Sequence, residues 1–137
     1  MRRPRSSAAS ELAAPPEPHF PGRATIEAYG GGGFRFAGMS HRGSILALPS
    51  GIWAWAPRTA QEIDAASLER VFGAGASVDL LLVGTGRELV PLGPALRSRL
   101  REASLIADVL PTAAAASTYN VLLAENRRVA AALIAVE

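Results

Sequence analysis

Val78-Asp79-Leu80-Leu81-Leu82-Val83-Gly84-Thr85-Gly86 is the stretch that decides the fold of this chain. Apart from Asp79, residues 78–83 are apolar at both alternating positions, which predicts a strand covered on both faces. Val129–Val136 has the same pattern. Two such strands with helices between them require layers above and below one sheet. The residues therefore predict a single three-layer α/β domain.

The other expected elements complete a central mixed, mostly parallel sheet of about five strands with helices on its faces. An N-terminal β-hairpin is expected where Ser44–Leu48 and Ile52–Ala56 flank Pro49-Ser50-Gly51, because this tripeptide suits a tight turn. The remaining expected elements are strands at Thr25–Tyr29 and Leu105–Leu110, a helix that ends near Phe72, and helices that begin at Pro94 and Thr112.

Residues 1–21 are predicted to form a disordered tail, and residues 22–137 the folded domain. The first 21 residues are rich in Arg, Ser, Ala and Pro, a composition that buries too little apolar surface to order a chain. Such a start also weakly resembles an organellar transit segment, so a targeting role stays open beside a plain tail. No apolar run is long enough to cross a bilayer, which predicts a soluble protein.

The residue inventory excludes several kinds of chemistry. The chain has no Cys, which removes disulfides, thiolate nucleophiles and thiolate metal ligands and fits a reducing compartment. All 14 basic residues are Arg, so lysine Schiff bases and the P-loop lysine are excluded as well.

The distribution of charge argues against a nucleic-acid partner, although the sequence pI is near 9.9. Residues 1–23 hold four Arg and two Glu, whereas residues 24–137 hold ten Arg and ten acidic residues. The predicted domain is electrically balanced and has no basic stripe with interleaved aromatics. We therefore expect only weak, non-specific affinity for nucleic acid.

A ligand site in such a domain is expected where strands end and helices begin. The candidate residues are Gly84, Thr85, Gly86, Thr112, Thr118 and Asn120. The glycine loop could present backbone N–H groups to an anion, although it lacks the third glycine of a dinucleotide fingerprint and the lysine of a P-loop. The structural alternative is a tight turn after a buried strand, with Thr112 as a helix N-cap and Tyr119 in the core with its hydroxyl satisfied.

No catalytic residue, metal ligand or cofactor is assigned. His41 and Ser44 lack a recognisable third triad member and an oxyanion motif. One His in the predicted domain and three widely spaced Asp residues give no metal-ligand spacing. The inventory thus favours a binding protein over an enzyme. Trp53 and Trp55 share one face of a predicted strand and are the candidate partner-binding residues, with a place in the core as the alternative.

Several short motifs occur in a characteristic order between residues 24 and 136. They are Gly33-Phe34, His41-Arg42-Gly43-Ser44, Asp79-Leu80-Leu81-Leu82-Val83-Gly84-Thr85-Gly86, Thr112, Thr118-Tyr119-Asn120-Val121-Leu122 and the run from Glu125 to Ile134. Together they resemble the Mth-like domain family, whose members include the adipogenesis-associated Mth-domain protein and an assembly factor of mitochondrial respiratory complex I. Asn126 stands where family members have Gly, a change that a left-handed backbone conformation absorbs. Leu110-Pro111 precedes Thr112 where many members have an Asp, which argues against an acid-dependent reaction.

The resemblance implies a small α/β domain with a five-stranded mixed sheet, no established catalytic activity and, in some members, a role in assembling NADH dehydrogenase at a membrane. The expected partners are then proteins, among them respiratory-complex subunits. The expected location is the bacterial cytoplasm, peripheral to the inner membrane, or the mitochondrion of a eukaryote.

Two functions therefore remain, and the sequence sets no oligomeric state for either. The first is a non-catalytic interaction or assembly module for a membrane-bound respiratory complex. The alternative is a small-molecule or anion-binding domain, or an enzyme, that uses the Gly84-Thr85-Gly86 loop and the Thr112 helix start. Burial separates them. Side chains of Thr85, Thr112 and Asn120 that converge on an open cleft would favour a ligand, whereas buried and mutually bonded side chains would favour the assembly module.

Overall fold

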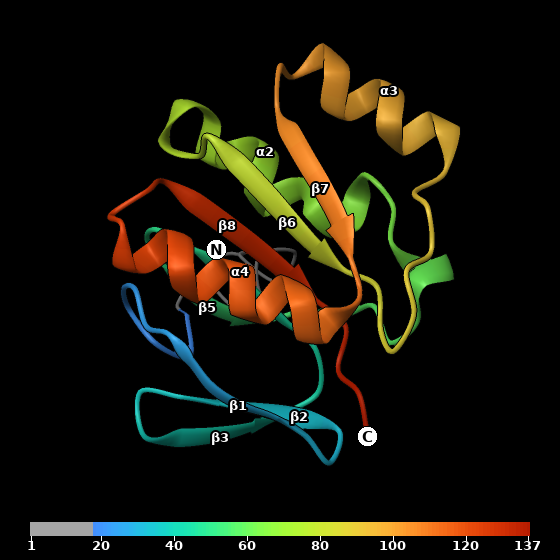
Figure 1. Cartoon of the computed structure of the whole chain (residues 1–137). Helices are drawn as coiled ribbons and strands as arrows, with labels where there is room; N and C mark the ends of the chain where they lie inside the picture. Colours follow the sequence, from blue (N-terminus) through green and yellow to red (C-terminus); the bar gives the residue numbers. More distant parts are fainter. Residues whose placement is uncertain (1–17) are drawn as a thin grey trace, which may run out of the picture.

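The structure, a computed structural model, describes residues 18–137 and contains two β-sheets and three α-helices in that range (Figure 1). The larger sheet has the strand order β5-β4-β8-β6-β7. Its strands are β4 (Ile45–Leu48), β5 (Gly51–Ala54), β6 (Leu80–Gly84), β7 (Ile106–Leu110) and β8 (Val129–Leu133). The smaller sheet consists of β1 (Ile26–Gly30), β2 (Gly33–Phe36) and β3 (Met39–Arg42). The helices are α2 (Glu69–Ala74), α3 (Pro94–Glu102) and α4 (Thr112–Ala124), with short 3-10 turns at Ala60–Glu62, Ala66–Leu68 and Gly75–Ser77.

The five-stranded sheet is mixed, as predicted. β6 pairs in parallel with β7 and with β8, whereas β4 pairs antiparallel with both β8 and β5. Every strand except β4 therefore runs in the same direction. The expected hairpin is formed by β4 and β5, with Leu48 opposite Gly51 at its turn.

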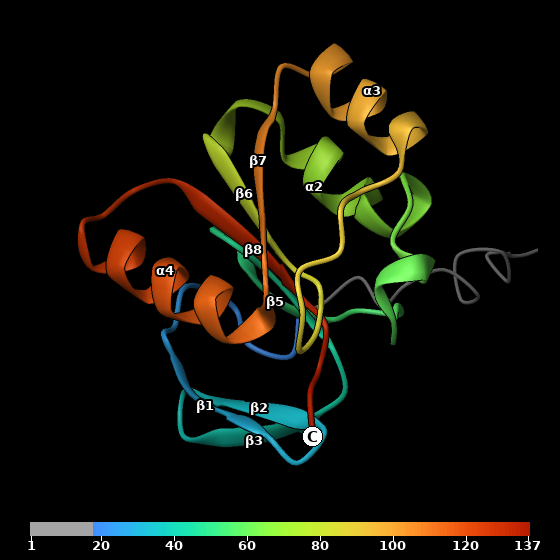
Figure 2. The same ribbon diagram turned by 45° about the vertical axis from the view of Figure 1, so that its right-hand side comes forward.

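Two apolar clusters on opposite faces of the sheet confirm the three layers. Leu81 and Val83 of β6 face the cluster that α2 and α3 cover, whereas Leu82 faces the cluster that α4 and β2 cover. The alternation arises because successive side chains of a strand point to opposite faces. Figures 1 and 2 show α4 on one side of the sheet and α2 and α3 on the other.

The three-stranded sheet extends beyond what the sequence predicts. Its first hairpin turns through Gly31 and Gly32, which have φ angles of 61° and 82° that favour glycine. Its last strand, β3, was not predicted, because Met39-Ser40-His41-Arg42 is polar and largely exposed and lacks an apolar alternation. Phe34 and Phe36 of β2 attach this sheet to the α4 side of the core.

The predicted boundary of the N-terminal tail needs a correction. The His19 N–H donates to the Ile52 carbonyl at 2.8 Å, and the Ile52 N–H donates to the Phe20 carbonyl at 2.9 Å. Phe20 also packs against the apolar cluster beside α4. His19 and Phe20 therefore pair with Ile52 of β5, because the free edge of that strand offers unpaired backbone groups. The rest of the predicted tail, residues 1–17, lies outside the described residues.

Candidate functional site

Thr112 connects the carboxyl ends of β6 and β8 with the start of α4. Its hydroxyl donates to the Ile134 carbonyl at 2.7 Å and accepts a hydrogen bond from the Gly86 N–H at 3.0 Å. The Thr112 N–H donates in turn to the Gly86 carbonyl at 2.8 Å. The side chain is fully buried. The predicted N-cap role is wrong, because Pro111 occupies the N-cap position and the Thr112 hydroxyl points to the strand ends instead.

Thr85 holds together the loop that follows β6. Its hydroxyl donates to the Glu88 carbonyl at 2.7 Å and accepts from the Val90 N–H at 3.0 Å. Its backbone N–H donates to the Leu110 carbonyl at the end of β7. Only 5% of the residue is exposed, so the hydroxyl both donates and accepts within the fold.

Gly84 is required by a close approach of the backbone. A Cβ atom at this position would lie 2.9 Å from the Thr112 Cα and 2.9 Å from Cδ2 of Leu133. Real Cβ atoms do not approach a backbone atom so closely, and neither Thr112 nor the strand end can move without breaking the bonds above. The glycine therefore admits the start of α4 to the end of β6.

Asn120 acts as a substitute strand partner for β1. Its Oδ1 accepts from the Ile26 N–H at 2.8 Å, and its Nδ2 donates to the Ile26 carbonyl at 2.9 Å. One side-chain amide thus satisfies both backbone groups of Ile26 and ties the small sheet to α4. Thr118 lies half buried on the same helix and belongs to neither set of bonds.

The predicted ligand residues therefore do not converge on an open cleft. The hydroxyls of Thr85 and Thr112 and the amide of Asn120 are all used in internal hydrogen bonds. A cavity of about 280 Å³ does lie at the start of α4, and Gly86, Arg87 and Ala113 line it. Of the six predicted residues, only Gly86 contributes to its wall.

Trp53 and Trp55 are corrected from partner-binding to core residues. They are only 7% and 6% exposed and belong to the apolar cluster that α2 covers. The Trp55 Nε1–H donates to the Ser67 carbonyl at 2.7 Å, and the Arg70 guanidinium lies 4.4 Å from the centroid of the Trp53 ring. An alternating aromatic pair has the same sequence pattern in a core and in an interface, so only packing distinguishes the two.

Tyr119 is fully buried, and its hydroxyl has no hydrogen-bond partner among residues 18–137. The expectation of a satisfied hydroxyl is therefore wrong. Burial raises the pKa of Tyr119 to about 12, because the phenolate would lose its solvation, and the nearby positive charge of Arg23 opposes this only in part. The side chain is neutral at physiological pH and serves the core.

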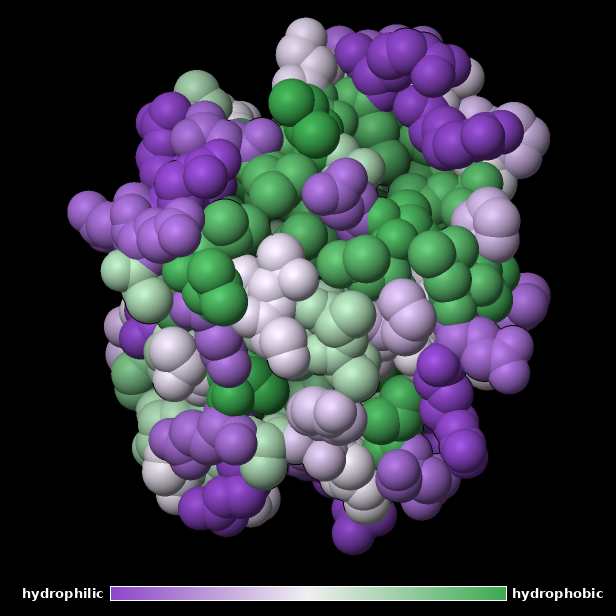
Figure 3. Space-filling model, viewed as in Figure 1, coloured by the Kyte–Doolittle hydropathy of each residue, from purple (hydrophilic) through white to green (hydrophobic). Residues whose placement is uncertain are grey.

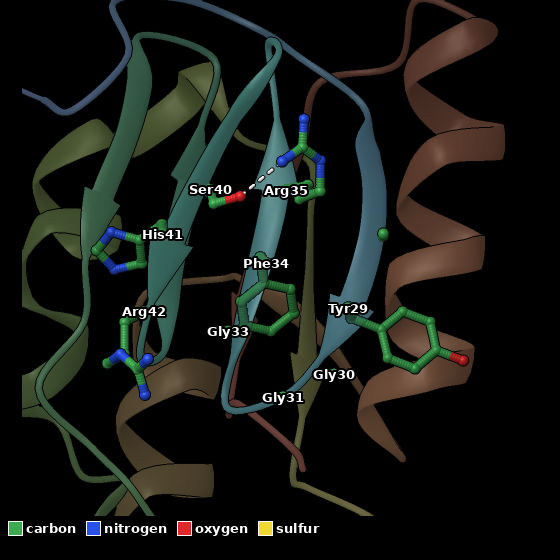
Figure 4. Close-up of a pocket in the computed structure, with 10 residues that line it drawn as sticks. Tyr29, Gly30, Gly31, Gly33, Phe34, Arg35, Ser40, His41 and Arg42 are labelled. Atoms are coloured by element: carbon green, nitrogen blue, oxygen red, sulfur yellow. Dashed lines mark hydrogen bonds between the residues drawn. The ribbon is translucent and has the colours of Figure 1, made fainter.

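A shallow cavity of about 480 Å³ lies on the three-stranded sheet (Figure 4). Backbone of Gly30 and Gly31 forms part of its wall, and Tyr29 and Arg42 lie on its β1 and β3 sides. Arg35 donates from Nη1 to the Ser40 hydroxyl at 2.6 Å, across the β2–β3 pair. Besides the guanidinium groups of Arg35 and Arg42, the lining of this cavity includes Tyr29, Ser40 and His41.

His41 and Ser44 do not form a base and nucleophile pair. The Ser44 hydroxyl is buried and accepts a hydrogen bond from the Ala135 N–H at 3.0 Å. The His41 ring stacks at a tilt on the His19 ring, with 4.9 Å between centroids. Partial burial lowers the pKa of His41, and the charge of His19 lowers it further.

An apolar groove between α3 and β7 is the surface feature that sequence reasoning missed. It measures about 380 Å³ and is lined by Leu89, Pro91, Leu92, Leu100, Leu105, Ala107 and Val109 together with Arg97 and Arg101. Figure 3 shows apolar side chains gathered on this part of the surface, next to the charged residues of α3. The groove combines a loop, a helix and a strand, so no single stretch of sequence displays its pattern.

The described part of the chain contains no group of three His, Asp or Glu side chains arranged to hold a metal ion. Across residues 18–137, no helix is both long and apolar enough to cross a membrane.

Comparison with known proteins places this arrangement in a family. The family described as "Protein of unknown function (DUF498/DUF598)" matches residues 26–134. An uncharacterised protein of Rhodobacter capsulatus is 41% identical over 88% of this chain and 92% of its own length. The NADH dehydrogenase (ubiquinone) 1 alpha subcomplex assembly factor 3 of Xenopus tropicalis is 32% identical over 80% of this chain. The alignment spans 60% of that assembly factor.

Solved structures show the same fold. A protein described as an outer membrane protein of Bartonella henselae is 50% identical, with a TM-score of 0.84 over 87% of this chain and 100% of its own. A Bordetella pertussis protein described as a Mth938-like domain is 30% identical, with a TM-score of 0.72 over 82% of this chain and 85% of its own. With the buried threonines, the close glycine and the mixed sheet in place, the chain belongs to the DUF498/DUF598 family of Mth938-like domains.

Proposed function

We propose that this protein is a non-catalytic module that binds other proteins and assists the assembly of an NADH dehydrogenase at a membrane. The observation that carries the proposal is the 32% identity with a protein named as an assembly factor of NADH dehydrogenase, over 80% of this chain. Because the alignment spans only part of that factor, its partners and its whole activity are proposals for this chain.

The geometry of the strand ends supports an interaction module over a ligand-binding domain. The polar side chains at the ends of β6 and β8 hold backbone groups of the same domain, as the two hydrogen bonds of Thr112 illustrate. A side chain that already satisfies a buried backbone atom is not free to bind a ligand unless that backbone atom finds another partner. The exposed apolar groove between α3 and β7 offers contact area for a protein instead.

The proposed partners are subunits or intermediates of the respiratory complex. The proposed place of action is the cytoplasmic side of a bacterial inner membrane, with the protein bound peripherally, or the mitochondrion if the source is eukaryotic. This proposal rests on the assembly-factor relatives.

Deletion of the gene in an organism whose membranes contain the multisubunit NADH dehydrogenase tests the proposal. We expect the assembled enzyme to fall on native gels and in membrane NADH oxidation, with succinate dehydrogenase unchanged as the internal control. A tagged copy should restore the enzyme and, after the membranes are solubilised, co-purify with its subunits. Normal levels of assembled enzyme in the deletion strain, together with no recovered subunit, would reject the assembly role.

The alternative is an anion or small-molecule site in the 280 Å³ cavity at the start of α4. Arg87 and the first turn of α4, at Ala113, line this cavity and favour an anion. Glu137 lines the same cavity and opposes one. A rise in melting temperature with inorganic phosphate that disappears in Arg87→Gln would support this alternative, and an unchanged melting temperature would speak against it.

A further inference from the structure

The outer edge of β7 carries unpaired backbone groups. Among the described strands, β7 ends the five-stranded sheet and pairs only with β6. The Leu110 carbonyl accepts from the Thr85 N–H, so this residue turns its backbone groups toward β6. Because these groups alternate in direction along a strand, Ala107 and Val109 direct theirs outward. Within residues 18–137, no backbone hydrogen bond reaches them from the outer side.

The apolar groove lies directly beside this edge. The side chains of Ala107 and Val109 line it from the strand, and Leu100 of α3 and Leu89 of the preceding loop line it from the other side. Leu89 is 51% exposed, and Ile106 on the opposite face of β7 is 66% exposed. An edge strand with free backbone groups and an adjoining apolar groove has the two elements that strand addition uses for affinity and for side-chain selection.

The charge around the groove indicates the chemistry of its occupant. Arg97 and Arg101 line the groove, and none of its lining residues in the described part of the chain is acidic. The one salt bridge among residues 18–137 joins Arg128 to Asp79. Within this range no carboxylate therefore pairs with Arg97 or Arg101. Residues 24–137 are balanced in charge as a whole, with these two arginines counted, so the positive charge at the groove is a local feature and favours an occupant with carboxylates.

We propose that an extended segment of a partner protein adds to the outer edge of β7 as a further strand. The segment places apolar side chains in the groove and carboxylates against Arg97 and Arg101. This inference rests on the proposed function as a protein-binding module, and it specifies the surface and the kind of segment that the module takes.

The charge of the groove favours an acidic partner segment over two other occupants, the N-terminal segment of this chain and a second copy of it. Residues 1–17 of the chain hold three Arg and two Glu, so the chain's own N-terminal segment brings the wrong sign of charge. A second copy that pairs its β7 antiparallel with this one would bring the same two arginines of both copies to one face of the joined sheet. Like charges placed together are destabilising.

The test uses an acetylated heptapeptide, Glu-Thr-Val-Thr-Val-Thr-Glu, as the probe. As a strand it places two Val and two Glu on one face. The matched control peptide has Lys in place of both Glu. Binding is measured by fluorescence anisotropy with labelled peptides, and amide hydrogen exchange is followed by NMR on the full-length protein.

Binding at the edge should protect particular amides. Without peptide, the amides of Ala107 and Val109 should exchange fast, whereas that of Asp108, which faces β6, should exchange slowly. Saturating acidic peptide should slow the exchange of Ala107 and Val109 by about tenfold or more and leave Asp108 unchanged. Unchanged exchange at Ala107 and Val109 would overturn the proposal. Protection that rises with protein concentration alone would overturn it in favour of a second copy.

Charge reversal tests the choice of occupant. The double variant Arg97→Glu with Arg101→Glu should bind the acidic peptide about tenfold more weakly and should prefer the lysine peptide. The matched control Arg127→Glu changes an exposed arginine beyond the end of α4 and should leave both affinities as in the parent. Equal binding of the two peptides by the parent protein would overturn the proposal.

Removal of an outward N–H tests the mode of binding. Ala107→Pro should abolish peptide binding while the fold persists, because proline is tolerated on an edge strand where its nitrogen faces outward. Unchanged peptide binding by a folded Ala107→Pro protein would overturn strand addition. No respiratory subunit enters these experiments. If the peptide fails to bind while the deletion strain lacks NADH dehydrogenase, the β7 edge is rejected and the assembly role is not.

Discussion

Thr112→Val removes one hydroxyl and keeps the shape of the side chain, so it isolates the two hydrogen bonds at the start of α4. The Gly86 N–H and the Ile134 carbonyl both lose their partner in a fully buried place. An orphaned buried group costs about 1–3 kcal/mol, and we therefore expect a loss of about 3 kcal/mol in the free energy of unfolding. For about 120 ordered residues this corresponds to a fall of about 12 °C in melting temperature.

The assay is thermal and urea unfolding of the parent and two control variants. Thr118→Val makes the same chemical change at a half-buried position on α4 and should shift stability by less than about 0.5 kcal/mol. Thr112→Ser keeps the hydroxyl and loses a methyl group, which should cost about 1 kcal/mol. A Thr112→Val protein as stable as Thr118→Val would refute the reasoning that this hydroxyl holds the strand ends together.

Three further outcomes are expected. Deletion of residues 1–17 should change the melting temperature by less than about 2 °C. Deletion of residues 1–21 should lower the melting temperature clearly, because it also removes the pairing of His19 and Phe20 with β5. Calorimetry on both proteins checks this. Because the pKa of His41 is lowered in the folded state, the unfolded state binds more protons between the folded pKa and 6.5. Stability should therefore fall as the pH drops through that window. His41→Gln should flatten the slope of melting temperature against pH. Trp55→Ala should lower the free energy of unfolding in urea by about 3–5 kcal/mol, because a buried indole and its bond to Ser67 are lost. A loss below about 1 kcal/mol would show that Trp55 does not belong to the core.

Much of the fold follows from local patterns. The two strands that are apolar on both faces, β6 and β8, require cover on both sides, and the structure has it. Asn126 adopts the left-handed conformation expected after the end of α4, with a φ of 60°. Strand β3 escaped prediction because its residues are mostly exposed, and an exposed strand leaves no hydrophobic alternation to read.

The sequence also located the place where the elements meet, but not what the polar residues do there. A threonine at a helix start has the same appearance whether it caps the helix, binds a ligand or bonds to another strand. The choice depends on which backbone groups lie within about 3 Å of its hydroxyl, and these belong to Gly86 and Ile134, which are 26 and 22 residues away along the chain.

By itself the sequence determined the layer architecture, the parallel core of the main sheet, the electrical balance of residues 24–137 and the lack of Cys and Lys side chains for catalysis. These properties depend on composition and on short periodic patterns, which any stretch of chain displays locally. Only the tertiary structure decided that Trp53 and Trp55 lie in the core and that Ala107 and Val109 border a groove on a free edge. Burial and edge position depend on which distant segments come to lie beside a residue, and a local pattern carries no information about that choice.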